Sequence, residues 1–433
     1  MNKINRFLVS CSTTWFVIYA TVAAFMTYFS MYAFRKTFAV ASFEDATGWD
    51  YQLDFKTSIV LAQVIGYALS KFIGIKVVSE MNAAGRAKAI LLLVLASEIA
   101  LVLFAVVPTG WKPATLFLNG LPLGMIWGLV FSFLEGRRVS EILGAGLSIS
   151  FIVSSGVVKS VGSWLMLTFA VTEYWMPALT GLLFIFPLFI SVFFLAQIPP
   201  PSEADKAERH IRQPMNASDR KRLFLSYLPG LVALILSYML LTAIRDYSDS
   251  FAAEIWASLG YGDQPGIFSQ AALYTSFAIL VLLSFIMFIK DNVRALMMNH
   301  AFIIFGLLTI GVSTLLFEQH IISGQVWMIV NSTGIYLAYI PFNCLLFDRM
   351  LAVLKDKANA GFLIYLADAM GYAGSVGILL YKSFFDVKLS WLNFMIESSY
   401  VISIIGSLLV LGSAWYFVIK LADKKAAMPL TTA

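Results

Sequence analysis

The sequence predicts an all-α membrane protein of twelve transmembrane helices, arranged as two pseudo-symmetric six-helix bundles. Three observations lead to this fold class. First, 60% of the 433 residues are hydrophobic and 13% are charged, and the mean hydropathy of +0.82 is too apolar for a surface exposed to water. Second, apolar segments long enough to cross about 30 Å of hydrocarbon recur along the whole chain. Third, the two halves of the chain repeat the same spacing of polar residues and glycines.

The apolar segments are long and continuous, unlike the short alternating strands of a membrane β-barrel, so they are expected to be helices. One long hydrophilic stretch, residues 199–222, separates the sixth segment from the seventh. The predicted domains are therefore a bundle at 1–198, a cytoplasmic linker at 199–222 and a bundle at 223–433. The twelve expected spans are 14–36, 55–78, 88–108, 113–134, 142–170, 175–197, 223–256, 268–290, 295–316, 324–347, 359–384 and 393–420.

Lysine and arginine are distributed unevenly between the two sides of these spans. The two termini, the linker and the loops on their side hold 21 of the 30 Lys and Arg residues, and the opposite loops hold four. The positive-inside rule then places both termini in the cytoplasm, and we expect a bacterial inner (plasma) membrane protein. The net charge of +5 is a topology signal and gives no reason to expect a nucleic-acid partner. The first span follows a short basic stretch with no cleavage site, so an uncleaved first helix is expected.

Two polar stripes mark the first and seventh spans. Tyr28, Tyr32 and Arg35 follow the i, i+4, i+7 spacing of one helix face, and Tyr238, Thr242 and Arg245 repeat this spacing 210 positions later. A charged side chain in a membrane helix is costly and normally faces a protein interior or a wet cavity. The matched arginines predict one central site that binds an anion.

Glycines repeat as well. Gly146, Gly156 and Gly162 in the fifth span recur 215 positions later in the eleventh, as Gly361, Gly371 and Gly377. Small residues let helices approach closely, so helix packing is the simpler interpretation of each glycine. Duplicated halves around a site near the bilayer midplane are, however, a known plan of secondary transporters.

Arg35 and Arg245 are the first candidates for substrate binding, because a guanidinium binds phosphate or carboxylate through two parallel hydrogen bonds and stays charged at physiological pH. The structural alternative for Arg35 is an anchor that reaches toward the membrane surface. For Arg245 it is an ion pair with Asp246 or Asp249.

Two lysines within spans, Lys71 and Lys159, are further candidates. Lys71 shares a polar helical face with Gln63, with Gly66 or Tyr67, and with Ser70, although it could instead reach the cytoplasmic surface. Lys159 lies too deep for that among serines, and its structural alternative is an ion pair, with Asp368 as the natural partner.

Asp368 is the most distinctive acid, and we interpret it either as a proton relay or as a fixed counter-ion of the site. Glu98, in the third span, is interpreted as structural. Phenol hydroxyls bind phosphate oxygens and tolerate apolar neighbours, so the tyrosines in register with these charges complete the predicted site: Tyr28, Tyr32, Tyr238, Tyr339 and Tyr372. No catalytic constellation, nucleotide-binding loop or metal motif is present, and the two cysteines form no disulfide pattern, so neither an enzyme nor a cofactor is expected.

Several segments resemble one known family. The span architecture resembles the major facilitator superfamily, and the first span, through Tyr28, Tyr32 and residues 35–39, is similar to the organophosphate:phosphate antiporters, which exchange glycerol 3-phosphate or hexose phosphates. Residues 66–74, which include Lys71, resemble that family's second helix, and Arg245 with residues 247–249 is placed like its seventh-helix arginine. Residues 339–341, 360–362 and 371–375 resemble its tenth and eleventh helices. The resemblance implies alternating access, with Arg35 and Arg245 clamping a phosphate and with Lys71, Tyr28, Tyr32, Tyr339 and Tyr372 around it.

These observations together predict a secondary transporter, expected to be a monomer, that moves a small organic anion, a phosphorylated metabolite, in exchange for phosphate. Two alternatives stay open. One is a proton-coupled carrier of a neutral or carboxylate solute that uses Asp368, and the other is a membrane receptor of the same fold that has lost transport.

Overall fold

The structure is a computed structural model, and it describes residues 3–44, 46–81, 83–137, 139–203, 205, 217–287, 289, 291–354, 360–385 and 389–426. Throughout these ranges the regular structure is helical, and no strand occurs in them. Half of the predicted linker, residues 204 and 206–216, lies outside the described residues. The apolar runs fold as helices because a helix satisfies every backbone N–H and C=O within its own segment, which the membrane interior requires.

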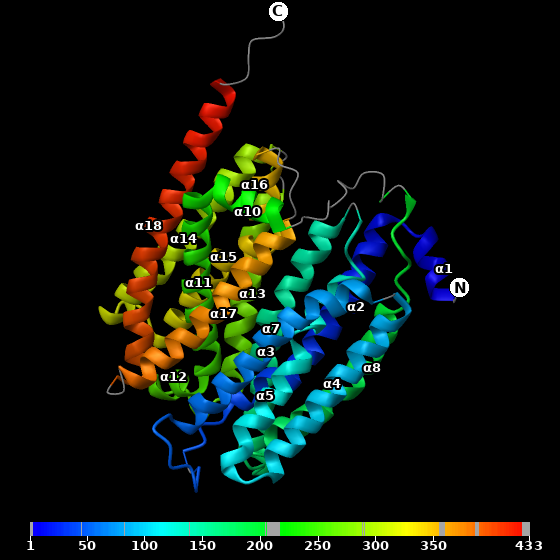
Figure 1. Ribbon diagram of the computed structural model, residues 1–433. Coiled ribbons are helices and arrows are strands. Elements are labelled where there is room, and N and C mark those ends of the chain that lie inside the picture. Colours follow the sequence, from blue (N-terminus) through cyan, green and yellow to red (C-terminus); the bar gives the residue numbers. More distant parts are fainter. Residues whose placement is uncertain are drawn as a thin grey trace, which may run out of the picture. The chain divides into compact units, whose positions relative to one another are not determined.

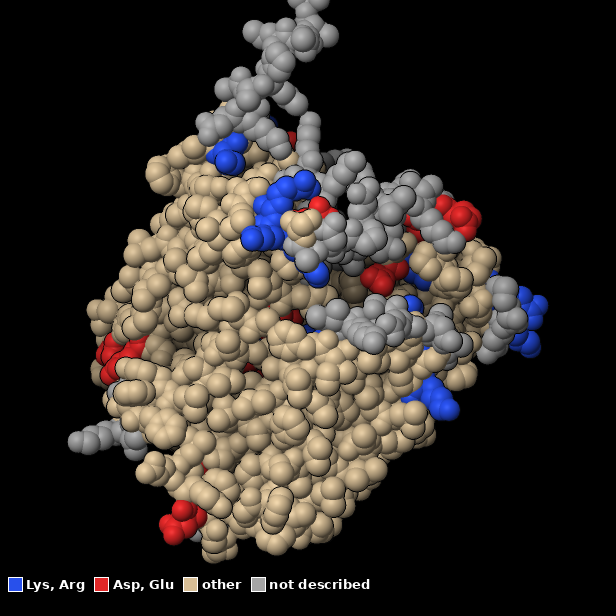
Figure 2. All heavy atoms as spheres, in the orientation of Figure 1, with Lys and Arg blue, Asp and Glu red and all other residues tan. Residues whose placement is uncertain are grey.

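Eleven helices of the described chain are long and apolar enough to cross a membrane, and a bent pair gives a twelfth span. The chain is therefore a multi-pass membrane protein, as predicted. In the view of Figure 2, most of the face is made of uncharged residues. Many large apolar side chains are exposed on the surfaces of the helices. Phe186 and Trp415, for example, are each 71% exposed, as expected for side chains that contact lipid.

The chain packs as two compact units, each described here by itself. Unit 1 comprises residues 1–210, 247–276 and 379–392, and unit 2 comprises residues 211–246, 277–378 and 393–433. The two six-helix bundles expected from the sequence remain a prediction.

Unit 1 contains the helices of the first half of the chain (Figure 1). Helix α2 packs against α7 and α8, α3 packs against α5, and α4 packs against α5 and α8. A short 3₁₀ helix η1 follows α2 directly, and α12 follows α11. The bounds are α1 Lys3–Ser10, α2 Thr13–Lys36, η1 Thr37–Val40, α3 Phe55–Glu80, α4 Ala83–Val106, η2 Thr109–Trp111, α5 Lys112–Leu123, α6 Ile126–Phe131, α7 Ser140–Phe169, α8 Met176–Leu195 and α12 Ala252–Ser258.

Unit 2 contains most of the second half. Helix α14 packs against α15 and α16, and α11 and α17 meet at glycines. Four of the helices of this unit are divided between the units: residues 247–250 of α11, 267–276 of α13, 379–384 of α17 and 391–392 of α18 belong to unit 1. The bounds are α10 Ala217–Ser226, α11 Leu228–Ser250, α13 Ile267–Met287, α14 Asn292–Glu318, α15 Gly324–Cys344, α16 Leu346–Leu354, α17 Ala360–Phe384 and α18 Trp391–Ala426.

Three predicted spans are interrupted where continuous helices were expected. The span predicted at 113–134 divides into α5 and α6 just after Pro122, and the span at 324–347 divides into α15 and α16 after Pro341, with a bend of 43°. Proline lacks the backbone donor and crowds the turn before it, whereas both breaks follow the proline, so proline alone does not account for them. The span at 223–256 divides into α10, α11 and α12.

Close helix contacts explain some of the repeated glycines. A Cβ at Gly156 would collide with Phe268 and Ala272 of α13, and a Cβ at Gly371 would lie 2.8 Å from Thr242 Oγ1 of α11. These two glycines therefore let helices approach closely, in agreement with the simpler interpretation. Gly377 has nothing within 4 Å of its would-be Cβ, so close packing does not account for it.

Candidate functional site

Arg35 lies at the end of α2 in unit 1, and it is buried at 8% exposure. Its guanidinium carbon lies 3.8 Å from the centre of the Tyr67 ring of α3, over the face of that ring. Its Nη1 is 3.5 Å from the Tyr32 hydroxyl, and Tyr32 packs edge to face with Tyr28. The predicted stripe of Tyr28, Tyr32 and Arg35 is therefore a real cluster. A cation over a tyrosine ring is stabilised by the negative face of the ring.

Lys71 approaches the same aromatic ring from one turn further along α3. Its ammonium lies 5.7 Å from the centre of the Tyr67 ring and 5.6 Å from that of Trp127. Arg35 and Lys71 thus share Tyr67. The sequence placed Tyr67 on the polar face of Lys71, four residues before it, but did not select it as a ligand.

The backbone carbonyls of Phe34 and Arg35 are bound by two buried side-chain amides, which are also hydrogen-bonded to each other. Gln63 donates to the carbonyl of Arg35 at 2.8 Å and to Asn119 Oδ1 at 2.7 Å. Asn119 in turn donates to the carbonyl of Phe34 at 2.9 Å and to Ser97 Oγ at 2.6 Å. Carbonyls at the end of a helix lack intrahelical partners, so these amides fix the point at which α2 stops.

A second cluster of charges in unit 1 surrounds Asp249. Lys36 Nζ lies 2.6 Å from Asp249 Oδ2, and Lys159 Nζ lies 2.5 Å from Asp249 Oδ1. Ser155 also donates to this carboxylate. Both lysines are buried, at 6% and 3% exposure. One carboxylate therefore serves two ammonium groups, and the cluster carries a net positive charge.

The partner of Lys159 differs from the one favoured by the sequence. Asp249, at the end of α11, takes the place expected for Asp368. Sequence reasoning could not choose between the two acids, because which helix faces α7 is decided by tertiary packing. Lys36 was also missed as a member of this cluster.

Lys56 and Glu254 form a further ion pair in unit 1. Lys56 also donates to the carbonyl of Ala39 in η1 at 3.0 Å. The pair therefore joins the start of α3, η1 and α12. Burial raises the pKa of Glu254 above its ordinary value, and the charge of Lys56 only partly opposes this effect.

In unit 2, Arg245 lies over the ring of Tyr339, with its guanidinium carbon 4.1 Å from the ring centre. Its Nε and Nη2 both contact Asp246 Oδ1, at 3.1 and 2.6 Å, which confirms one of the two pairings considered from the sequence. The other Asp246 oxygen accepts from Ser375 at 2.7 Å. Arg245 thus resembles Arg35 in lying over a tyrosine, and it also forms an ion pair with Asp246.

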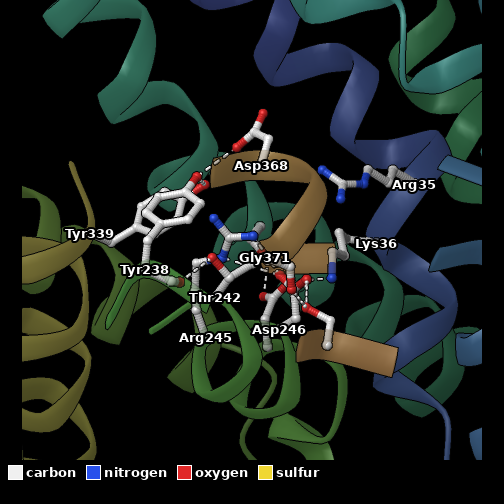
Figure 3. Close-up of polar contacts among 12 residues, drawn as sticks. Arg35, Lys36, Tyr238, Thr242, Arg245, Asp246, Tyr339, Asp368 and Gly371 are labelled. Atoms are coloured by element: carbon white, nitrogen blue, oxygen red, sulfur yellow. Dashed lines mark hydrogen bonds and ion pairs between the residues drawn. The ribbon is translucent and has the colours of Figure 1, made fainter. Parts of the chain in front are cut away.

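Asp368 is held by Tyr238 of the same unit, and Tyr238 in turn contacts Tyr339 (Figure 3). The Tyr238 hydroxyl donates to Asp368 Oδ1 at 2.6 Å and lies 2.9 Å from the Tyr339 hydroxyl. The Tyr238 and Tyr339 rings stack at 5.0 Å. Tyr372 is buried on α17, one turn after Asp368. Unit 2 therefore gathers Tyr238, Tyr339, Arg245 and Asp368 into one hydrogen-bonded and stacked group.

No group of three or more His, Cys, Asp or Glu side chains that could hold a metal ion occurs within the described ranges. The chemistry available in both units is reversible binding through cations, phenols and amides.

Comparisons with known proteins agree on the fold. The structure is similar to a D-xylose-proton symporter, with a TM-score of 0.63, 12% identity and coverage of 92% of this chain and 96% of the other. It is also similar to the nucleoside transporter NupG (TM-score 0.58, 13% identity, coverage 93% and 98%). A third similar structure is a bacterial homolog of the human lysosomal transporter Spinster (TM-score 0.58, 11% identity, coverage 100% of both chains). No curated protein sequence matches the chain.

The all-helical architecture and these similarities define the class: the chain is a multi-pass membrane protein with the major facilitator fold. Residues 37–420 match the family described as "Family of unknown function (DUF5690)", and the chain belongs to this family.

Proposed function

We propose that this protein is a secondary transporter that moves a small organic anion by alternating access. The fold supports the transport class, because the named structures that share it are a sugar symporter, a nucleoside transporter and a relative of a lysosomal transporter. Within this class, the substrate we propose is a phosphorylated metabolite, exchanged for phosphate.

The observation that carries the proposal is the excess of cations within the membrane-spanning helices of unit 1. Arg35, Lys36, Lys71 and Lys159 lie in α2, α3 and α7, and Asp249 is the acid that contacts two of them. Positive charge at this depth is costly unless it is paired or used. The surplus favours an anionic ligand and disfavours a cationic one.

Arg35 is the proposed principal ligand in unit 1, with Lys71, Lys159, Tyr28 and Tyr32 as further ligands. Its position over Tyr67 and the amides that hold its backbone give the guanidinium a defined place before any substrate arrives. Such preorganisation lowers the entropy cost of binding. The fork of N–H donors matches phosphate or carboxylate in a way that an ammonium cannot.

In unit 2, Arg245 is the proposed anion ligand, with Tyr339 and Tyr372. Asp246 neutralises part of its charge, which should lower the binding energy that Arg245 contributes. The role that we propose for Asp368 is to hold the Tyr238 hydroxyl, which in turn positions Tyr339.

The test is thermal stabilisation of the purified protein in detergent by phosphate, sugar phosphates, glycerol phosphate and carboxylates, followed by exchange of the best ligand in proteoliposomes. A ligand at one hundred times its Kd stabilises the folded state by about 2.7 kcal/mol. We expect a phosphorylated compound to raise the melting temperature, and Arg35→Ala to abolish the increase. Arg35→Lys should keep the charge but lose most of the effect.

Arg349→Ala is the matched control. Arg349 also lies in a helix and contacts Asn292 at 2.7 Å, but it belongs to none of the groups described above. Its removal should leave the ligand-induced shift unchanged. A shift with neutral compounds alone would mean that the arginines are structural, and binding without any flux would indicate a receptor.

A further inference from the structure

Glu98 is a buried acid that the proposed site does not use. It lies in α4 and is 5% exposed, and both carboxyl oxygens are shielded from solvent. Neither oxygen has a hydrogen-bond partner among the residues that the structure describes. Val106, the last residue of the span, follows eight positions later, which is about 12 Å along a helix, so Glu98 lies well inside the apolar layer.

The carboxyl group lies where three helices of unit 1 meet. Helix α4 packs against α2 and α8. A Cβ at Gly181 of α8 would collide with Glu98 Oε2 and would lie 3.1 Å from Cδ1 of Phe34 in α2. The absence of a side chain at residue 181 therefore leaves room for the Glu98 carboxyl. The Phe34 ring packs next to the same glycine.

Few charged groups lie on the helices that pack around α4. Helices α6 and α8 carry no ionisable side chain. On α5 the one cation is Lys112, whose ammonium donates to the carbonyl of Phe104 at 2.5 Å and lies over the Tyr174 ring. On α2 the cations are Arg35 over Tyr67 and Lys36 at Asp249, and its phenols are Tyr19, Tyr28 and Tyr32. No cation or donor from these helices reaches the Glu98 oxygens.

A carboxylate in such a place would be very unstable. Burying an ionised group without a partner costs far more than burying its neutral form, so the group takes up a proton instead. In the packing described here, Glu98 is therefore the neutral acid. To ionise, it needs either water, which must enter between α2, α4 and α8, or a cation from one of these helices.

The surroundings of Glu98 are also connected to Arg35. Phe34, which contacts the same glycine, precedes Arg35 directly. Ser97, next to Glu98, is hydrogen-bonded to Asn119, which holds the Phe34 carbonyl, and Asn119 is bonded to Gln63, which holds the Arg35 carbonyl. A rearrangement that hydrates Glu98 would therefore move the end of α2 that carries Arg35.

We propose that Glu98 is a proton-binding site that couples proton movement to transport: it is protonated while α2, α4 and α8 are packed as described, and it releases its proton to entering water when their contacts open. The coupling rests on the proposed transport function. The proton site itself does not, because it follows from burial and from the missing partners.

The first experiment is infrared spectroscopy of the wild-type protein in lipid at neutral pH, compared with Glu98→Gln. We expect the wild type to show the carbonyl-stretch band of protonated carboxylic acids. In the variant, the component of this band that comes from Glu98 should be lost. Glu254→Gln, which removes a different buried glutamate, should keep that component. If the component persists in Glu98→Gln, Glu98 is ionised and the proposal is wrong. Glu98→Met provides the same comparison should the glutamine variant not fold.

The second experiment measures anion uptake driven by a pH gradient in proteoliposomes. Glu98→Gln, a neutral isostere of the protonated acid, should retain exchange without a gradient but lose the additional uptake that the gradient drives. Uptake driven equally in the variant and the wild type would refute the coupling. If the infrared component is lost but the wild type moves no anion, the proton site stands and the transport proposal fails.

Discussion

Asp249 shows how much one residue can control in a membrane interior. Its carboxylate contacts two buried lysines from different helices, at 2.6 and 2.5 Å. In a medium of low dielectric constant such pairs are strong, but each partner has lost its hydration, so the removal of one partner costs more than the pair contributes. Removal of Asp249 should therefore lower the stability of the fold more than removal of either lysine.

We predict that Asp249→Asn is among the most destabilising single substitutions in unit 1. It leaves two buried lysines uncompensated, and the loss of one partner of a buried pair typically costs about 3–5 kcal/mol. Lys36→Met and Lys159→Met should each cost less, since the remaining lysine still neutralises Asp249. Melting temperatures in detergent test this order, and an Asp249→Asn protein as stable as the wild type would contradict it.

At the residue scale, the sequence reveals positions within one helix but not the partners on other helices. The spacing of Tyr28, Tyr32 and Arg35 predicted a common face, and the structure shows these side chains together. Tyr67 and the lysine pair at Asp249 depend on which helices are neighbours, which periodicity does not contain. Asn119 left a usable signal, because an amide in an apolar span must find partners.

At the element scale, the end of α2 is determined by the side chains of its neighbours. The carbonyls of Phe34 and Arg35 are bonded by amides from α5 and α3, and η1 starts immediately afterwards. The helix therefore ends in a turn that carries both of its cations, Arg35 and Lys36.

Asn119→Leu should consequently destabilise the protein and also weaken anion binding. A buried polar group left unsatisfied costs about 1–3 kcal/mol, and this change leaves the Phe34 carbonyl and Ser97 without Asn119. Asn331→Leu is the control, because Asn331 is equally buried and donates to Thr314 and Ser399 in unit 2. Both variants should lower the melting temperature, but only Asn119→Leu should reduce the ligand-induced shift. An equal reduction of the ligand-induced shift in both variants would mean that lower stability alone causes it, and that Asn119 has no specific role in anion binding.

Helix breaks are harder to predict than helices. Pro122 and Pro341 each precede a break, whereas Pro187 lies within an uninterrupted α8. The same residue type thus has different outcomes, because neighbouring helices and side chains can compensate for the missing donor of a membrane proline. The sequence predicted the spans, but not which of them would be divided.

At the scale of the whole molecule, stability should depend on pH through Glu254. Its pKa is raised in the folded state by burial, so the folded protein binds this proton more tightly than the unfolded chain, whose glutamates titrate near about 4.3. The stabilisation is therefore fully present below that unfolded value and is lost as pH rises through the folded pKa.

We predict that Glu254→Gln removes this part of the pH dependence. Melting temperatures of the two proteins, measured from acidic to neutral pH, should show the wild type losing stability relative to the variant as pH increases. Parallel curves would mean that burial does not govern the protonation of Glu254.

The class of fold follows from composition and span length, and it is confirmed by the structure and by its similarity to known transporters. The sequence could not decide how the ends of the second-half helices pack. Residues 247–276 and 379–392 belong to the same compact unit as the first half of the chain, and there Lys36, Lys56 and Lys159 find their acids. That arrangement depends on contacts between residues 90 to 213 positions apart in the sequence.

The last helix has a practical consequence for imaging. Helix α18 continues without a break for 36 residues, about 54 Å at 1.5 Å per residue, whereas the hydrocarbon layer is about 30 Å thick. The helix is therefore longer than the hydrocarbon layer is thick, and Figure 1 shows it as one continuous ribbon at the C-terminal end of the described chain. A soluble marker protein joined to it through one continuous helix would give electron microscopy an additional feature for aligning particles of this 48.0 kDa protein.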